Sequence, residues 1–125
     1  MTLPTDRLYT ADHEWLRIDG DTAIVGVTAF AADALGDIVY LDPPAIGSTV
    51  SAGEPCGEIE STKSVSDLVA PADGEVLETN QDVLDDPGTV NVDPFGTGWL
   101  FRMRLASTPD LLDAGGYAEL IRDAS

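Results

Sequence analysis

Basic residues are scarce in this chain of 125 residues: 6 lysines and arginines stand against 23 aspartates and glutamates, which gives a net charge of −17 at pH 7. A field of that sign repels phosphate backbones and anionic lipid headgroups, so the composition argues against nucleic-acid and membrane-surface functions. No apolar run approaches the roughly 20 residues of a membrane span. The first residues lack the patterns of a secretory signal or a transit peptide, so we expect a cytoplasmic protein.

Histidine, cysteine and lysine each occur once, as His13, Cys56 and Lys63. A lone cysteine cannot form an internal disulfide and is typical of a reducing compartment. A lone histidine excludes a multi-histidine metal centre, so we expect no metal site. Because the other basic residues are all arginines, any chemistry that needs a lysine amine falls on Lys63.

Short β-rich runs separated by glycine and proline make up most of the chain, which has 12 glycines and 8 prolines and is 43% hydrophobic. This length and composition are typical of one globular domain, and the spacing of turn residues predicts a mainly β fold. A hairpin turn is expected at Asp19–Asp21, where Gly20 can adopt a positive φ. The predicted strands are Glu14–Ile18, Thr22–Val27, Asp37–Leu41, Cys56–Ser61, Val65–Ala70, Gly74–Thr79 and Trp99–Leu105.

Helix signals are few. One helix is predicted over Ala29–Leu35, between the N-cap candidate Thr28 and the terminating Gly36. Near the C-terminus the pattern predicts a helical turn that begins at Pro109 and includes Leu111 and Leu112, an interruption at Gly115 and Gly116, and a last helix over Tyr117–Arg122.

A weak internal repeat divides the sequence into two halves. Gly36–Val39 is similar to Gly74–Leu77, and Gly47–Val50 is similar to Pro87–Val90. Each half would then form a similar set of strands. Two such halves can close one core as a flattened barrel.

Lys63 lies between two predicted strands, at the apex of a hairpin. An exposed tip lysine is accessible to an acylating enzyme, and an amide there would hold a cofactor on a long, flexible stem. The sequence supplies no second cation and no evident apolar pocket that would activate the amine, which argues against a Schiff-base catalyst. On the residues alone, a solvated turn lysine is the alternative.

The hairpin segment Glu60–Asp67 resembles the lipoylation hairpin of the H-protein family of the glycine cleavage system. Biotinyl carriers share the tip lysine but are expected to place methionine on both sides of it, where this chain has Thr62 and Ser64. No single segment is decisive, but several in order over nearly the whole chain form a strong signal. The other segments that follow the order of the family are Tyr9–Trp15, Gly26–Thr28, Ala34–Val39, Ala70–Val76 and Asp93–Leu100.

This resemblance implies a single lipoyl-carrier domain over residues 1–125, with the lipoyl hairpin at about 56–70. The implied fold is a mainly β barrel–sandwich hybrid of the lipoyl-domain type, with short helices including one at the C-terminus. The implied cofactor is lipoate, bound covalently to Lys63. The implied function is that of a non-catalytic carrier, which shuttles an aminomethyl group from a pyridoxal-phosphate glycine decarboxylase to a tetrahydrofolate-dependent aminomethyltransferase.

The same resemblance implies two further partners, a dihydrolipoyl dehydrogenase that uses FAD and a lipoate-attaching enzyme. We expect the carrier to be a monomer that binds neither nucleic acid nor membrane. In the family the loaded arm folds back against the segment that matches Asp12–Trp15. Glu14 is therefore a candidate partner for the ammonium group of that arm, with Asp67 as a second and Asp12 as a third candidate. On spacing alone, Glu14 is one surface carboxylate among many.

Two further chemically capable residues are expected to be structural. His13 could act as a base but lies beside an aromatic residue, and Cys56 lies on a half-buried strand without a nearby histidine. Three alternatives stay open: an H-like lipoyl carrier of another pathway, such as sulfur oxidation or lipoate relay; an unmodified β-domain used for binding; and an enzyme that uses His13, Cys56 and acidic residues. The last lacks a triad signature. The predicted core aromatics are Trp15, Phe30, Trp99 and Phe101.

Overall fold

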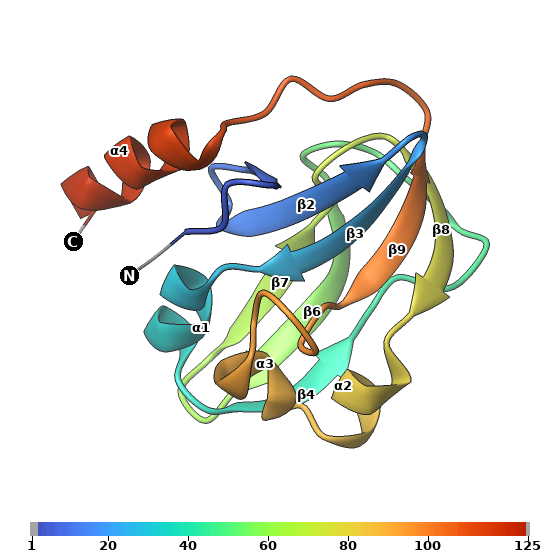
Figure 1. The fold of residues 1–125 in the computed structure, drawn as a ribbon. Helices are drawn as coiled ribbons and strands as arrows, with labels where there is room; N and C mark the ends of the chain where they lie inside the picture. Colours follow the sequence, from blue (N-terminus) through green and yellow to red (C-terminus); the bar gives the residue numbers. More distant parts are fainter. Residues whose placement is uncertain (1–2, 125) are drawn as a thin grey trace.

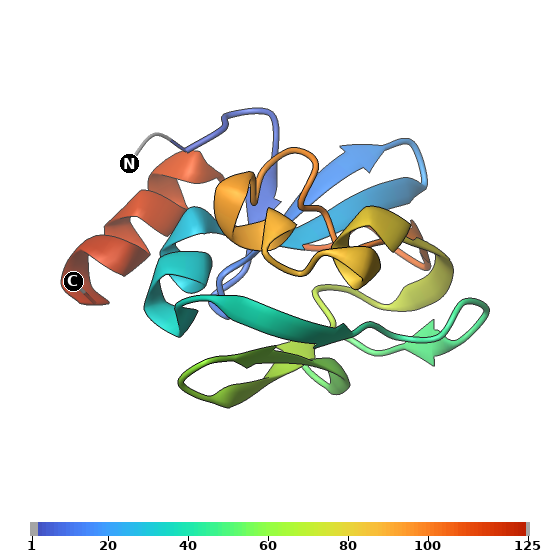
Figure 2. The same ribbon diagram turned by 90° about the horizontal axis from the view of Figure 1, so that it is seen from below.

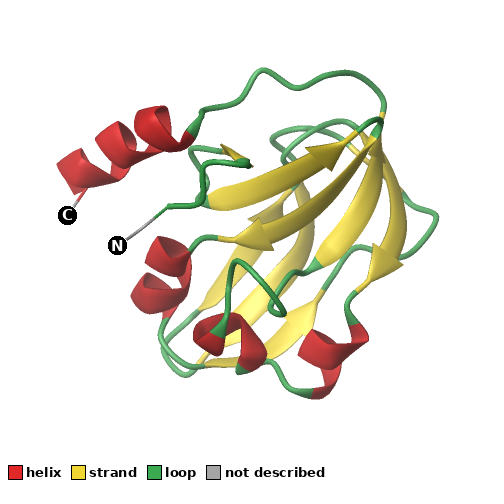
Figure 3. Cartoon of the chain, viewed as in Figure 1, coloured by secondary structure: helices red, strands yellow, loops and turns green. Residues whose placement is uncertain are grey.

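The computed structural model describes residues 3–124, which form two β-sheets with short helices at their margins (Figures 1 and 3). The larger sheet has the order β1-β2-β3-β9-β8-β5 and the smaller has the order β4-β6-β7. The strands are β1 (Leu8–Tyr9), β2 (Glu14–Asp19), β3 (Thr22–Val27), β4 (Ile38–Asp42), β5 (Thr49–Val50), β6 (Pro55–Ser61), β7 (Val65–Val69), β8 (Gly74–Thr79) and β9 (Phe101–Leu105). The helices are α1 (Ala29–Leu35), α2 (Gln81–Asp85), α3 (Thr89–Val92) and α4 (Ala114–Ala124).

The main core lies between the two sheets, which form separate layers in Figure 2. Leu16, Val25 and Met103 come from the larger sheet, and Ile59 and Leu68 come from the smaller one; all five are 2% exposed or less. The strand order confirms the mainly β fold of two packed sheets with short helices, but the sheets do not close into a barrel.

A second cluster fixes helix α4 to the larger sheet. Tyr117 of α4 stacks on Tyr9 of β1, with ring centroids 4.9 Å apart, and Trp15 of β2 belongs to the same cluster. The helix begins directly after Asp113, whose carboxylate accepts a hydrogen bond from the Gly116 N–H at 2.7 Å. No helix of residues 3–124 is both long and apolar enough to cross a membrane.

Several local predictions are confirmed. The turn between β2 and β3 has Gly20 at φ 64°, as the hairpin requires. Helix α1 has Thr28 as its N-cap, with the Thr28 hydroxyl accepting the Ala31 N–H, and Gly36 as its C-cap at φ 84°. Among the predicted core aromatics, Trp15 and Phe101 are buried, whereas Phe30 and Trp99 are only half-buried.

The predicted helical turn at Pro109–Leu112 is wrong. Leu112 instead pairs with Tyr9 as an isolated β-bridge, with both backbone hydrogen bonds formed at 2.7 and 2.9 Å. The predicted interruption at Gly115 and Gly116 is also wrong, because both glycines lie inside α4. The cap at Asp113 and the burial of Tyr117 compensate for the low helix propensity of glycine.

The repeat does not describe the structure. Thr49–Val50 forms strand β5, but the matching residues Thr89 and Val90 lie in helix α3. The two halves therefore do not form similar sets of strands. Helices α2 and α3 instead lie side by side at one margin of the molecule, where they contact each other (Figure 1).

Candidate functional site

Lys63 lies at the tip of the hairpin that joins β6 to β7, and it is exposed. The turn closes through a hydrogen bond from the Ser61 N–H to the Ser64 carbonyl at 2.8 Å. The Ser61 hydroxyl also accepts the N–H groups of Lys63 and Ser64, at 3.1 and 3.2 Å. The hairpin thus presents the lysine amine to solvent on a turn whose backbone is held by the Ser61 side chain.

The tip rests on the loop between α1 and β4. The Thr62 N–H donates to the Asp37 carbonyl at 3.0 Å. The Lys63 stem passes over Gly36, because a Cβ at that position would lie 3.1 Å from Lys63 Cε. Figures 1 and 2 both show the hairpin tip beside the C-terminal end of α1 and the start of β4.

A cavity of about 210 Å³ opens beside this end of α1. Three carboxylates, those of Asp12, Glu14 and Asp67, line it. Its other walls are largely apolar and include Val27, Ala31, Ala34, Leu35, Ile59 and Leu68. Leu35, which lines the cavity, directly precedes Gly36, over which the Lys63 stem passes, so this wall of the cavity lies near the lysine.

Glu14 is the buried member of the three carboxylates, at 4% exposed, whereas Asp12 and Asp67 are exposed. Its Oε2 accepts the N–H of Val69, on strand β7, at 3.2 Å. Its Oε1 is buried and has no hydrogen-bond partner among residues 3–124. Burial raises the pKa of Glu14 to about 8, and the charge of Asp12 raises it as well, whereas the Val69 N–H and the Thr10 side chain lower it.

An unpartnered carboxylate oxygen on a residue that lines a largely apolar cavity is suited to a cation that supplies both charge and hydrogen-bond donors. The structure therefore brings together the three carboxylates named from the sequence, at one cavity near the lysine. Their contact with a loaded arm stays a prediction. The spacing of Glu14 in the sequence, taken alone, favoured a surface carboxylate. That expectation is wrong, because the side chain is buried.

His13 lines the cavity, and its ring contacts Tyr117 of helix α4. Its Nδ1 is 2.9 Å from the Tyr117 hydroxyl, which shares a second hydrogen bond of 2.7 Å with the Thr28 hydroxyl. Its ring packs on Phe30 with centroids 4.8 Å apart, and its backbone has φ 66°. Burial lowers the pKa of His13. Sequence analysis missed Tyr117, because it lies 104 residues from His13.

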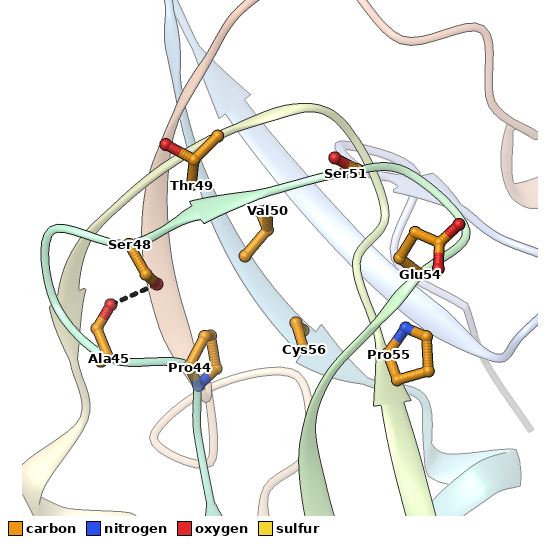
Figure 4. A pocket seen from close by; sticks show the side chains of 9 residues that line it. All are labelled: Pro44, Ala45, Ser48, Thr49, Val50, Ser51, Glu54, Pro55 and Cys56. Carbon is orange, nitrogen blue, oxygen red and sulfur yellow. Dashed lines mark hydrogen bonds between the residues drawn. The ribbon is translucent and has the colours of Figure 1, made fainter.

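A larger hollow, of about 390 Å³, lies at the start of β6, far along the hairpin from Lys63 (Figure 4). Its only side chains with ionisable groups are Glu54 and Cys56. Burial and the charge of Glu14 raise the pKa of Cys56 to about 12, so the sulfur is a thiol at neutral pH. Cys56 packs against the main core, which agrees with its expected structural role.

Charge is distributed unevenly over the molecule. From residue 18 to residue 101, Lys63 is the only basic residue. The arginines of β9 form ion pairs on the larger sheet, Arg102 with Glu78 at 3.3 Å and Arg104 with Glu75 at 3.0 Å. The smaller sheet therefore presents one cation, at its tip, within an acidic surface.

Two packed sheets that display a single lysine at a hairpin tip define a protein of the lipoyl-domain-like class. The family model described as "Glycine cleavage H-protein" matches residues 7–124 of this chain. The chain therefore belongs to the glycine cleavage H-protein family.

Relatives with the name "Glycine cleavage system H protein" match along almost their entire length. The protein of Beutenbergia cavernae is 58% identical over 120 residues, which cover 96% of this chain and 97% of the relative. The protein of Thermobifida fusca is 56% identical over 121 residues, which cover 96% of each. A crystal structure of a glycine cleavage system H protein from Mycobacterium marinum is 48% identical, with a TM-score of 0.90, and the match covers 98% of this chain and 100% of that one.

Proposed function

We propose that this protein is the lipoyl-lysine carrier of a glycine cleavage system, with lipoate attached to Lys63. The observation that carries the proposal is the exposed tip lysine beside a cavity that contains a buried, unpartnered carboxylate oxygen of Glu14. Family membership supports it. The lipoyl group would supply a disulfide that accepts the aminomethyl group from a pyridoxal-phosphate glycine decarboxylase, and a dithiol after delivery to a tetrahydrofolate-dependent aminomethyltransferase.

The chain itself is not the catalyst in this proposal. Its hairpin displays the lysine to a lipoate-attaching enzyme, to the decarboxylase, to the aminomethyltransferase and to the FAD-dependent dihydrolipoyl dehydrogenase that regenerates the disulfide. In this proposal, one carrier domain spans the sequence of 125 residues, and the hairpin of β6 and β7 is its lipoyl hairpin. The acidic surface around the tip favours partners with basic contact surfaces.

The cavity would protect the loaded arm. A primary ammonium that enters it meets the Glu14 carboxyl, with Asp67 and Asp12 at the rim. Glu14 holds a proton at neutral pH while the cavity lacks a cation, because its pKa is about 8. An ammonium ion beside it favours the ionised carboxylate, so binding of the arm would be coupled to release of that proton.

The test of attachment is an intact-mass measurement. The purified chain, incubated with a lipoate-attaching enzyme, lipoate and ATP, is expected to gain one lipoyl group, and Lys63→Arg is expected to gain none. The lipoylated chain is then expected to support exchange of bicarbonate into glycine by glycine decarboxylase. A lipoylated chain that fails in this exchange would indicate a carrier of another pathway, and an unmodified wild-type chain would indicate a binding domain.

The test of the cavity uses Glu14→Gln, with Glu58→Gln on the exposed face of β6 as the matched loss of charge. Both variants are expected to be lipoylated and loaded. Without the aminomethyltransferase, the loaded Glu14→Gln protein is expected to release ammonia several-fold faster than wild type, because a neutral amide pairs more weakly with an ammonium ion. Equal release from both variants would place the protecting group elsewhere.

A further inference from the structure

The loop that supports the hairpin tip is itself held by one side chain. Asn91 of α3 donates its Nδ2–H to the Gly36 carbonyl at 2.8 Å, and its Oδ1 accepts the Ile38 N–H at 2.9 Å. One primary amide thus binds an acceptor and a donor on either side of Asp37. Two simultaneous bonds of this kind fix both the position and the tilt of the loop.

The loop that Asn91 binds also contacts the hairpin tip directly. The Asp37 carbonyl, between the two residues that Asn91 binds, accepts the Thr62 N–H at 3.0 Å. The Lys63 stem lies against Gly36, whose φ of 84° and missing side chain leave room for it. The side-chain amide of Asn91 therefore supports the tip turn and the lysine stem through the same three-residue loop.

Helix α3, which carries Asn91, is held in place by packing on two sides, although it spans only Thr89–Val92. Val90 is fully buried in the main core. Gly98 packs against the backbone of the helix so closely that a Cβ there would lie 2.9 Å from the Thr89 carbonyl oxygen. The helix is thus clamped between the core and the loop before β9, and Asn91 projects from a fixed support.

We propose that Asn91 is a positioning residue that sets the direction of the Lys63 amine for the lipoate-attaching enzyme. This inference rests on the proposed lipoylation of Lys63. The neutral Nζ amine must reach the acyl carbon of enzyme-bound lipoyl-adenylate, where an amide bond forms, the bond from the acyl carbon to the phosphate oxygen breaks, and AMP and one proton leave. A displacement of the amine by about 1 Å can reduce such a rate by about 100-fold.

The experiment compares Asn91→Ala and Asn91→Asp with Asn80→Ala as the matched control. Asn80 is 4% exposed, and like Asn91 it hydrogen-bonds to the backbone through its amide, which donates to the Thr97 and Trp99 carbonyls at 2.8 and 2.7 Å. Its loss therefore destabilises the fold without touching the loop under the tip. Asn91→Asp keeps an acceptor for Ile38 but places an oxygen against the Gly36 carbonyl.

The readouts are kcat/KM for lipoylation by a lipoate ligase, measured well below the Tm of every variant, and the rate of acetylation of Lys63 by a small N-hydroxysuccinimide ester. The small reagent reports exposure alone. We expect both Asn91 variants to lose about 10- to 100-fold in kcat/KM with acetylation unchanged, and Asn80→Ala to be lipoylated at the wild-type rate.

Wild-type kcat/KM in the Asn91 variants, or an equal loss in Asn80→Ala, would overturn the inference. If the wild-type chain is not lipoylated, the proposed function fails instead, and amide hydrogen exchange at Thr62 decides the structural claim. Loss of Thr62 protection in Asn91→Ala but not in Asn80→Ala would then support the positioning role. Unchanged protection would refute it.

Discussion

Glu14 gives the fold an unusual dependence on pH that can be measured without any cofactor or partner. The carboxyl is 4% exposed and its pKa is about 8 in the folded chain, compared with an ordinary value of 4.5. Between these two values, the folded state holds a proton that the unfolded state has lost. Because the unfolded state binds fewer protons, the free energy of unfolding falls as the pH rises through this interval.

The substitution that removes this dependence is Glu14→Gln. Its amide oxygen can still accept the Val69 N–H but cannot ionise. One pKa unit corresponds to about 1.36 kcal/mol. The stability of Glu14→Gln relative to wild type is therefore expected to increase by up to about 4 kcal/mol between about pH 5 and pH 8. A pH-independent cost of placing an amide in the cavity changes the stability difference by the same amount at every pH, so it does not affect this increase.

The assay is urea unfolding of the unmodified chain at several pH values across this interval, followed by the fluorescence of the two tryptophans. Glu58→Gln, on the exposed face of β6, is the control for the same substitution at an exposed position. A stability difference between Glu14→Gln and wild type that stays constant with pH would refute the reasoning. It would mean that the buried Glu14 carboxyl is ionised in the folded chain throughout the interval.

Local signals in the sequence predicted the strands and the hairpins well. The β2–β3 turn needs a residue that accepts positive φ, and Gly20 supplies it. The β6–β7 hairpin was expected at about 56–70 and is formed by Pro55–Val69. In each case the turn residues and the neighbouring strands agree with one another, so short-range information is sufficient.

In the segments that were predicted wrongly, the backbone structure depends on tertiary contacts. The repeat matched Pro87–Val90 with Gly47–Val50, but Thr89–Val92 forms a helix whose Val90 is buried in the core and on whose backbone Gly98 packs. Leu112 has a helix-favouring residue before it, yet its backbone pairs with Tyr9, more than 100 residues earlier. Single-sequence patterns contain no information about such distant partners.

The candidate site was predictable only in part, for the same reason. Lys63 stands out because it is the only lysine and lies at a predicted turn. The resemblance to the family identified the three carboxylates, but not the burial of Glu14. That burial arises because β2 and the edge strand β7, distant in sequence, meet at the Val69 N–H. Asn91 gave no signal, since an asparagine near Asp93 and Pro94 is typical of an ordinary loop.

Two further predictions concern the packing of β2, β3 and α4. Gly26→Ala is expected to destabilise the fold by about 3 kcal/mol, measured by urea unfolding, because a Cβ would lie 2.5 Å from the Trp15 ring. That ring cannot move aside, since its Nε1–H donates to the Val27 carbonyl and to the Pro94 carbonyl. Tyr117→Phe removes the hydroxyl that binds His13 and the fully buried Thr28, and leaves both polar groups without this partner. The expected cost is about 2 kcal/mol. Because His13 lines the cavity that the loaded arm would occupy, Tyr117→Phe is also expected to speed ammonia release from the loaded protein while lipoylation stays normal. A loss of stability with unchanged ammonia release would show that α4 supports the fold but not the cavity.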